Sequence, residues 1–184
     1  TCLPLRELES LVAMLAQSAA QAPGATGEIE FTVEANPATI SRAGLSRLRR
    51  AGINRLSIGV QSLDPRELAV LGRVHTAEQA LSAVDDARAA GFENISVDLI
   101  LGAPGQTPDS LRRTLAGFLA LDRPPEHVSA YCLQLETGTP LERSVSLGET
   151  TVPDADDTAK LYEVVVEALS RAGYARYEVS NFAL

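Results

Sequence analysis

Cysteine is scarce in this chain, which has two in 184 residues. Cys2 and Cys132 cannot build a framework of disulfides, and they do not have the spacing of a structural zinc site. Cys132 lies in an apolar run, where we expect a small buried side chain. This use of cysteine favours a cytoplasmic location.

Long hydrophobic runs and an excess of basic charge are also missing. No stretch is long and apolar enough to span a bilayer. The apolar stretch 11–22 is interrupted by polar residues, and no basic segment precedes it as a signal peptide would require. The net charge of -8 argues against nucleic-acid binding, which needs a basic face. The composition is therefore that of a soluble globular protein.

Several catalytic signatures are absent from the sequence. The turn at residues 102–107 lacks the lysine of a Walker A loop and the glycine spacing of a dinucleotide-binding fingerprint. His75 and His127, the only histidines, do not have the spacing of a metal-ligand set, and there is no Gly-x-Ser-x-Gly elbow. We interpret His75 as a loop residue and His127 as the first residue of a strand.

What the sequence does contain is an alternation of strand-like and helix-like segments. Polar N-cap residues precede several of the helices. Repeated βα units of this kind predict a parallel sheet with right-handed crossovers, in one layered α/β unit over residues 1–184. Strands are expected at residues 28–34, 55–61, 94–101, 127–133 and 174–179, and helices at 5–21, 41–51, from 64 onward, 76–90, 107–121 and 155–172.

Polar residues stand where three of these strands end. Glu34 and Gln61 follow apolar runs, and Asp98 lies inside the apolar run 95–101. In sheets and barrels of parallel strands, sites form at the carboxyl ends of several strands. Three such residues, each ahead of a helix, predict a shared pocket.

Asp98, Glu34 and Arg73 each have a structural and a functional interpretation. An unpaired Asp98 carboxylate in an apolar strand would be costly, so it either holds a loop or faces a ligand's hydroxyl or ammonium group. Glu34 either caps the turn that follows it or accepts hydrogen bonds from a ligand. Arg73, in a loop, is either solvated or pairs with a ligand carboxylate.

Seven segments, in order along the chain, belong together: residues 34–37, 52–62, 71–76, 97–107, 127–131, 135–140 and 177–183. Together they resemble the radical S-adenosylmethionine family of oxygen-independent coproporphyrinogen III oxidases and their relatives. That family has a branch of true oxidases, which convert coproporphyrinogen III to protoporphyrinogen IX, and a branch regarded as heme chaperones. Residues 71–76 and 177–183 resemble the chaperone branch more closely.

The resemblance implies a partial (β/α)6 barrel whose strand ends hold S-adenosylmethionine beside a 4Fe-4S cluster. By motif position, Glu34 corresponds to a residue that contacts the first S-adenosylmethionine. Gln61, Arg73 and Asp98 correspond to residues that line a second cofactor position. For the chaperone branch, the resemblance also implies heme as a bound partner and a client protein that accepts it.

One departure from the family is decisive for what this chain can do. The CxxxCxxC loop that holds the cluster is missing, and neither Cys2 nor Cys132 can replace it. The Gly-Gly-Gly-Thr-Pro strand end is missing too, with Thr1 as its last remnant, and the chaperones' His-Asn…Tyr-Trp segment would follow Ala183. We therefore expect the central and C-terminal part of a radical S-adenosylmethionine core, inactive alone.

Three hypotheses of function follow for the longer protein. The first is a heme chaperone, and the second is an oxygen-independent coproporphyrinogen III oxidase. The third is a non-catalytic binding module, which applies if the longer protein lacks the cluster loop.

Overall fold

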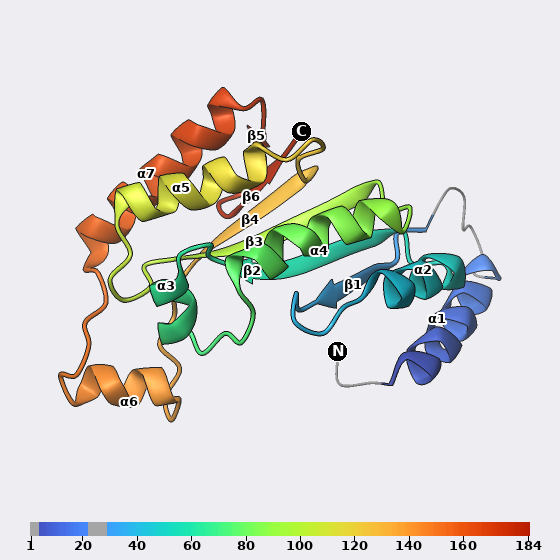
Figure 1. The fold of residues 1–184 in the computed structure, drawn as a ribbon, viewed down its shortest axis with the longest axis horizontal. Coiled ribbons are helices and arrows are strands. Elements are labelled where there is room, and N and C mark those ends of the chain that lie inside the picture. Colours follow the sequence, from blue (N-terminus) through green and yellow to red (C-terminus); the bar gives the residue numbers. More distant parts are fainter. Residues whose placement is uncertain (1–3, 22–28) are drawn as a thin grey trace.

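A six-stranded sheet in the order β1-β2-β3-β4-β6-β5 forms the centre of the structure (Figure 1). The computed structural model describes residues 4–21 and 29–184. The strands are β1 Thr32–Ala35, β2 Arg55–Gln61, β3 Asn94–Leu101, β4 His127–Cys132, β5 Ala175–Arg176 and β6 Asn181–Ala183. The helices are α1 Leu5–Ala20, α2 Arg42–Ala51, α3 Pro65–Val70, α4 Ala77–Ala89, α5 Pro108–Leu119, α6 Pro140–Ser146 and α7 Ala155–Arg171.

The predicted parallel arrangement is confirmed for β1 to β4 and does not extend further. β6 pairs antiparallel with β4, and β5 pairs antiparallel with β6. The single strand predicted at 174–179 is therefore wrong: the four residues 177–180 connect two strands, and so short a connection joins antiparallel neighbours only. The start of the first predicted strand, Glu28, lies outside the described residues, as do Thr1 and Cys2.

The predicted helix starts are confirmed by their capping contacts. The side chains of Ser41, Asp64, Thr76 and Thr107 each accept a hydrogen bond from a backbone N–H in the first turn of the following helix. Gly52, with φ +113°, ends α2 in the left-handed conformation that favours glycine. These signals are local, which is why the sequence alone reveals them.

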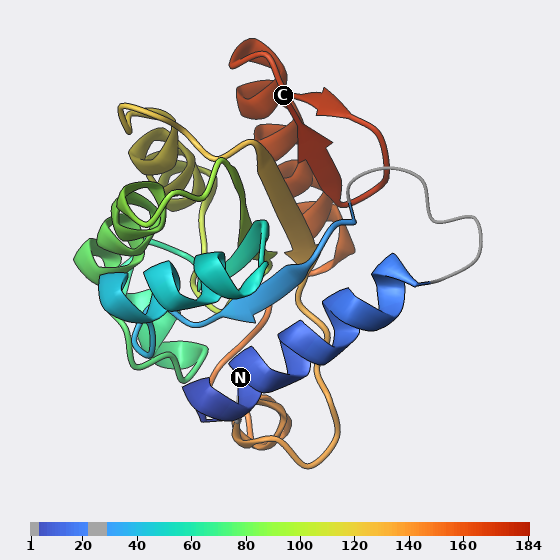
Figure 2. The same cartoon turned by 90° about the vertical axis from the view of Figure 1, so that its right-hand side faces the viewer.

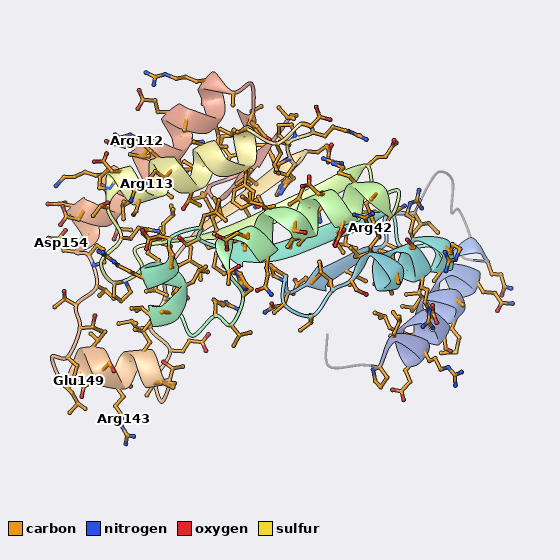
Figure 3. All side chains as sticks on the ribbon, in the orientation of Figure 1. Arg42, Arg112, Arg113, Arg143, Glu149 and Asp154 are labelled. Carbon is orange, nitrogen blue, oxygen red and sulfur yellow. The ribbon has the colours of Figure 1, made fainter. Side chains whose placement is uncertain are left out.

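Helix α6 lies between the strand predicted at 127–133 and the helix predicted at 155–172, where no element is expected from the sequence. It stands apart from the sheet in Figure 1, and none of its residues is buried. Arg143 points away from the rest of the molecule in Figure 3. With no apolar side turned to a core, α6 has no hydrophobic periodicity by which it could have been predicted.

Helices cover one face of the sheet, which we call the outer face. α2 contacts α4 and α5 contacts α7, and α2, α4 and α5 follow one another along this face in Figures 1 and 2. Side chains of alternate strand residues are fully buried there, and they form one core with the helices. From β2 and β3 these side chains are Leu56, Ile58, Val60, Ile95, Val97, Leu99 and Leu101.

The expectation that Cys132 is buried is wrong. The burial of β4 stops after Ala130, which is 1% exposed, and the last two residues of the strand are exposed. Cys132 is the terminal residue of β4 and lies beyond the packed part of the strand. Among the described helices, none is long and apolar enough to cross a membrane.

Candidate functional site

The other face of the sheet, which we call the inner face, carries small and polar side chains. Strand register places Glu34 beside Ser57, and Gly59 beside Asp98, which in turn is beside Ser129. Neighbouring strands lie about 4.8 Å apart, so these side chains form one continuous polar surface. The apolar outer face and this polar inner face thus alternate along the same strands.

Asp98 is held on the inner face by a hydroxyl group. The Ser57 Oγ lies 3.0 Å from Oδ1 and 3.1 Å from Oδ2 of Asp98. Burial raises the pKa of Asp98, opposed by the hydroxyls of Ser57 and Ser129, while the nearby Glu34 carboxylate raises it further and Arg55 lowers it. Within the described residues Asp98 forms no salt bridge and binds no backbone amide.

Glu34 does not cap the turn after β1. That turn is closed by Asn36, whose Oδ1 accepts the backbone N–H of Ala38 at 3.0 Å. Glu34 is exposed and lines a pocket of about 220 Å³ with residues of α1 and α2. The interpretation of Glu34 as the cap of this turn is therefore wrong, and its carboxylate lies at the pocket.

Gln61 is held in a strained conformation over the inner face. Its φ of +69° lies in the left-handed region, which costs a non-glycine residue about 1 kcal/mol. Its Nε2 lies 2.9 Å from the position that a Cβ on Gly59 would occupy. Because Gly59 is the register partner of Asp98, the amide of Gln61 lies over the same part of the sheet as the Asp98 carboxylate.

Arg73 lies in the segment between α3 and α4, at a neighbouring pocket. This pocket, of about 300 Å³, is lined by Arg73 together with Ile100 and Leu133 at the carboxyl ends of β3 and β4. The Arg73 Nε is buried and has no hydrogen-bond partner among the residues described. The structure thus brings Glu34, Gln61 and Asp98 to one surface and places Arg73 beside it.

A hydrogen-bonded chain on the inner face escaped the sequence analysis. His127 Nδ1 lies 2.8 Å from Ser96 Oγ, and its Nε2 lies 2.8 Å from the hydroxyl of Tyr177. Burial lowers the pKa of His127, Arg55 lowers it further, and Glu30 opposes the shift. His127 is the first residue of β4, as predicted; the period-two spacing of polar residues in this strand would have indicated its face.

His75 also lies in a loop, as predicted, but it is buried. One ring nitrogen, Nε2, lies 2.9 Å from the carbonyl oxygen of Val60 on β2. This contact fastens the loop that carries Arg73 to the strand that carries Gln61. Sequence reasoning could not find it, because the contact depends on the tertiary structure.

The inner face fits S-adenosylmethionine better than it fits an iron–sulfur cluster. Two carboxylates and an amide suit a ligand with ammonium and ribose hydroxyl groups, and Gly59 leaves room on the strand for the Gln61 amide beside Asp98. A 4Fe-4S cluster needs gathered thiolates. The described residues contain no group of three or more side chains that could hold a metal ion, and the sequence has two cysteines. The residues present therefore do not fit the cluster.

Comparison with known proteins relates the chain to several curated relatives. Heme chaperone HemW of Mycobacterium tuberculosis is 44% identical over 155 residues, which are 84% of this chain and 39% of the relative. Heme chaperone HemW of Bacillus subtilis is 41% identical over 84% of this chain and 40% of its own length. Radical S-adenosyl methionine domain-containing protein 1, mitochondrial, of Bos taurus is 42% identical over 94% of this chain and 38% of its own length. The chain spans about two fifths of these relatives.

Solved structures share the fold. Coproporphyrinogen III oxidase (HemN) from Escherichia coli, a radical SAM enzyme, matches with a TM-score of 0.81 and 25% identity, over 98% of this chain and 40% of that chain. The archaeal Elp3 of Methanocaldococcus infernus matches in fold with a TM-score of 0.68 and 23% identity, over 77% of this chain and 33% of that chain. The predicted barrel-type α/β fold is confirmed.

A family model described as the radical SAM superfamily matches residues 1–116, more than half of the chain. This match agrees with the fold, with the polar residues at the strand ends, and with the relatives just named. The chain belongs to the radical SAM superfamily.

Proposed function

We propose that this chain is part of a heme chaperone that binds S-adenosylmethionine on the inner face of its sheet. The observation that carries the proposal is the 44% identity to a heme chaperone over 84% of the chain. The carboxylates of Glu34 and Asp98 support it, because they suit the donor groups of the cofactor. Since the chain spans about two fifths of that relative, heme binding and delivery are proposed for the whole protein.

The residues of this chain would bind and orient the cofactor. Asp98 and Glu34 would accept hydrogen bonds from its ammonium or ribose hydroxyl groups, and Gln61 can both donate and accept. Arg73 would pair with a carboxylate in the neighbouring pocket. When bound beside a 4Fe-4S cluster, S-adenosylmethionine would supply radical chemistry, and the ligands of that cluster would come from outside this chain.

The proposed cargo is heme, and a client protein would receive it. A cytoplasmic location goes with this proposal, on the ground of the low cysteine content. The negative net charge of the chain supports a protein or small-molecule partner over a nucleic acid.

The test uses the full-length protein, prepared anaerobically and reconstituted with iron and sulfide. Heme is titrated into it, binding is followed by the Soret absorption, and a heme-free acceptor protein is then added. We expect saturable heme binding and transfer of heme to the acceptor. A protein that takes up neither an iron–sulfur cluster nor heme would contradict the proposal.

The inner-face site is tested separately, by equilibrium dialysis with S-adenosylmethionine. Asp98→Ala should weaken binding about tenfold, because one hydrogen bond to a charged group is lost. Asp109→Ala is the matched control, since Asp109 is an exposed carboxylate that pairs with Arg112 on α5. Equal affinities of the two variants would exclude the inner face as the binding site.

A second candidate function is oxidative decarboxylation of coproporphyrinogen III to protoporphyrinogen IX. It is favoured by the match in fold to coproporphyrinogen III oxidase over 98% of this chain. Mass spectrometry of the products formed by the reconstituted full-length protein distinguishes the two functions. A third candidate, a non-catalytic binding module, requires that the residues preceding Thr1 lack a cysteine cluster, which sequencing of the gene decides.

A further inference from the structure

A buried carboxylate outside the inner face connects the loops around it. Glu67, on α3, is 2% exposed and forms no salt bridge within the part of the chain that the structure describes. Three donors surround it instead. Ser62 Oγ lies 2.7 Å and Gln106 Nε2 lies 2.9 Å from its Oε2, and Ser110 Oγ lies 2.5 Å from its Oε1.

The charge of Glu67 fixes the direction of these hydrogen bonds. An ionised carboxylate only accepts, so both hydroxyls and the amide must donate to it. Their own oxygen atoms are then free to accept hydrogen bonds from the backbone of nearby loops. These bonds run from the N–H of Asp64 to Ser62 at 2.9 Å, of Gly102 to Gln106 at 2.7 Å, and of Thr107 to Ser110 at 3.0 Å.

The loops held in this way are those at the carboxyl ends of β2 and β3. Residues 62–64 follow directly after Gln61, the residue with the strained φ. Helix α3 itself leads to Arg73, whose backbone N–H donates to Leu68 of that helix. Residues 102–107 form the turn after the strand that carries Asp98. The Glu67 carboxylate is therefore hydrogen-bonded to the loops that follow Gln61 and the strand of Asp98, and it lies on the helix that leads to Arg73.

We propose that Glu67 is a positioning residue for the candidate site. Its charge holds the loops after β2 and β3 in the arrangement that places Gln61 and Arg73 toward the ligand. The proposal rests on the proposed function in naming S-adenosylmethionine as that ligand. The loop-holding role itself depends only on the contacts of Glu67.

Glu67→Gln in the full-length protein tests the proposal. The variant keeps the shape of the side chain but removes its negative charge and places an NH2 group against one of the three donors, so the hydrogen bonds to the carboxylate are weakened. Glu126→Gln is the matched control: Glu126 also accepts several hydrogen bonds, from Arg88 and the N–H of Ile95, but it lies at the amino end of β3. Ser110→Ala, which removes a single donor, serves if Glu67→Gln does not fold.

Amide hydrogen exchange of the ligand-free proteins is the first readout. For Glu67→Gln we expect exchange at least about tenfold faster in residues 61–73 and 100–107, because hydrogen bonds to a charged group are lost. The control should leave these segments unchanged. Faster exchange spread evenly over the molecule in both variants would overturn the positioning role.

Affinity for S-adenosylmethionine is the second readout. We expect Glu67→Gln to weaken binding about tenfold and Glu126→Gln to leave the affinity unchanged within experimental error. This difference should hold even if the two variants lower the midpoint of unfolding by the same amount. Unchanged affinity in Glu67→Gln would overturn the inference. If the wild-type protein binds no S-adenosylmethionine, the proposed function fails, whereas the exchange comparison still decides the role of Glu67.

Discussion

Asp98 is a residue that the fold tolerates at a cost to stability. It shares its strand with side chains that are fully buried on the outer face, yet its own partner is the hydroxyl of Ser57. Burial disfavours the charged form of the carboxyl, which is why its pKa is raised. A charge held under such conditions is typical of a residue kept for binding rather than for stability.

Asp98→Asn should therefore stabilise the folded protein near neutral pH. With its pKa raised above the ordinary 3.8, folded Asp98 binds more protons than unfolded Asp98, so the unfolding free energy falls as pH rises from about 3.8 through the folded pKa. Asp98→Asn lacks this decrease, so its free energy of unfolding at pH 7 should be about 0.5–1 kcal/mol higher than that of the wild type. Urea unfolding of both proteins from pH 3 to pH 8 measures it, with Asp109→Asn as control. Identical pH profiles for wild type and Asp98→Asn would contradict the prediction.

The candidate site could be predicted from the sequence only in part. Glu34, Gln61 and Asp98 were found because each follows or interrupts an apolar run, a signal that is local in the sequence. The pocket at Arg73 and the contact of His127 with Tyr177 depend on segments that are far apart in the sequence: His127 and Tyr177 are 50 residues apart, and the pocket brings Arg73 to Leu133. Nothing near Glu67 in the sequence indicates that it is buried.

Among the elements, α5 and the loop after β2 are packed unusually closely. Gly117 lies inside α5, where glycine ordinarily weakens a helix by about 1 kcal/mol relative to alanine. A Cβ at this position would lie 2.5 Å from Cδ1 of Leu63, in the loop that follows Gln61. The glycine is explained by this close approach.

Gly117→Ala should consequently destabilise the protein by about 1 kcal/mol, because Leu63 must leave its position. In a Leu63→Ala background the same change should instead stabilise by up to about 1 kcal/mol, as helix propensity then decides. Thermal unfolding of the two single variants and the double variant gives the coupling energy. Stabilisation by Gly117→Ala in both backgrounds would show that the contact with Leu63 does not affect the free energy of unfolding.

Among the elements, the helix starts and the parallel strands could be predicted from the sequence, whereas α6 and the direction of β6 could not. Capping residues such as Ser41 and Thr107 act within one turn, so they are visible in the sequence. Helix α6 has no buried side, and the antiparallel direction of β6 is decided by its pairing with β4. The position of α6 and the direction of β6 both depend on which other segments they contact in the folded chain.

For the whole molecule, the structure predicts an uneven distribution of stability. β3 is paired on both sides, with β2 and β4, and its outer side chains are fully buried. Helix α6 has no buried residue and stands apart from the sheet (Figure 1). Regions with few buried contacts open at low free energy, and central strands open only with the whole fold.

Native-state hydrogen exchange should accordingly rank the segments in a fixed order. Amides of β3 should exchange only through global unfolding, and those of α6 should exchange through local opening at a far lower free energy. Peptide-resolved mass spectrometry over a range of denaturant measures both. Protection of α6 equal to that of β3 would show that α6 is packed against a part of the molecule that these contacts do not include.

The alternation of side chains along β1 to β4 has a consequence for how the protein can change over generations. Substitutions on the outer face alter core packing and so affect folding, whereas those on the inner face, such as at Ser57 or Ser129, alter the polar surface on which we propose that the ligand binds. Because consecutive residues of a strand are under different kinds of selection, the residues of the inner face can change while the fold is conserved. A single barrel-like sheet can in this way give rise to both catalysts and carriers.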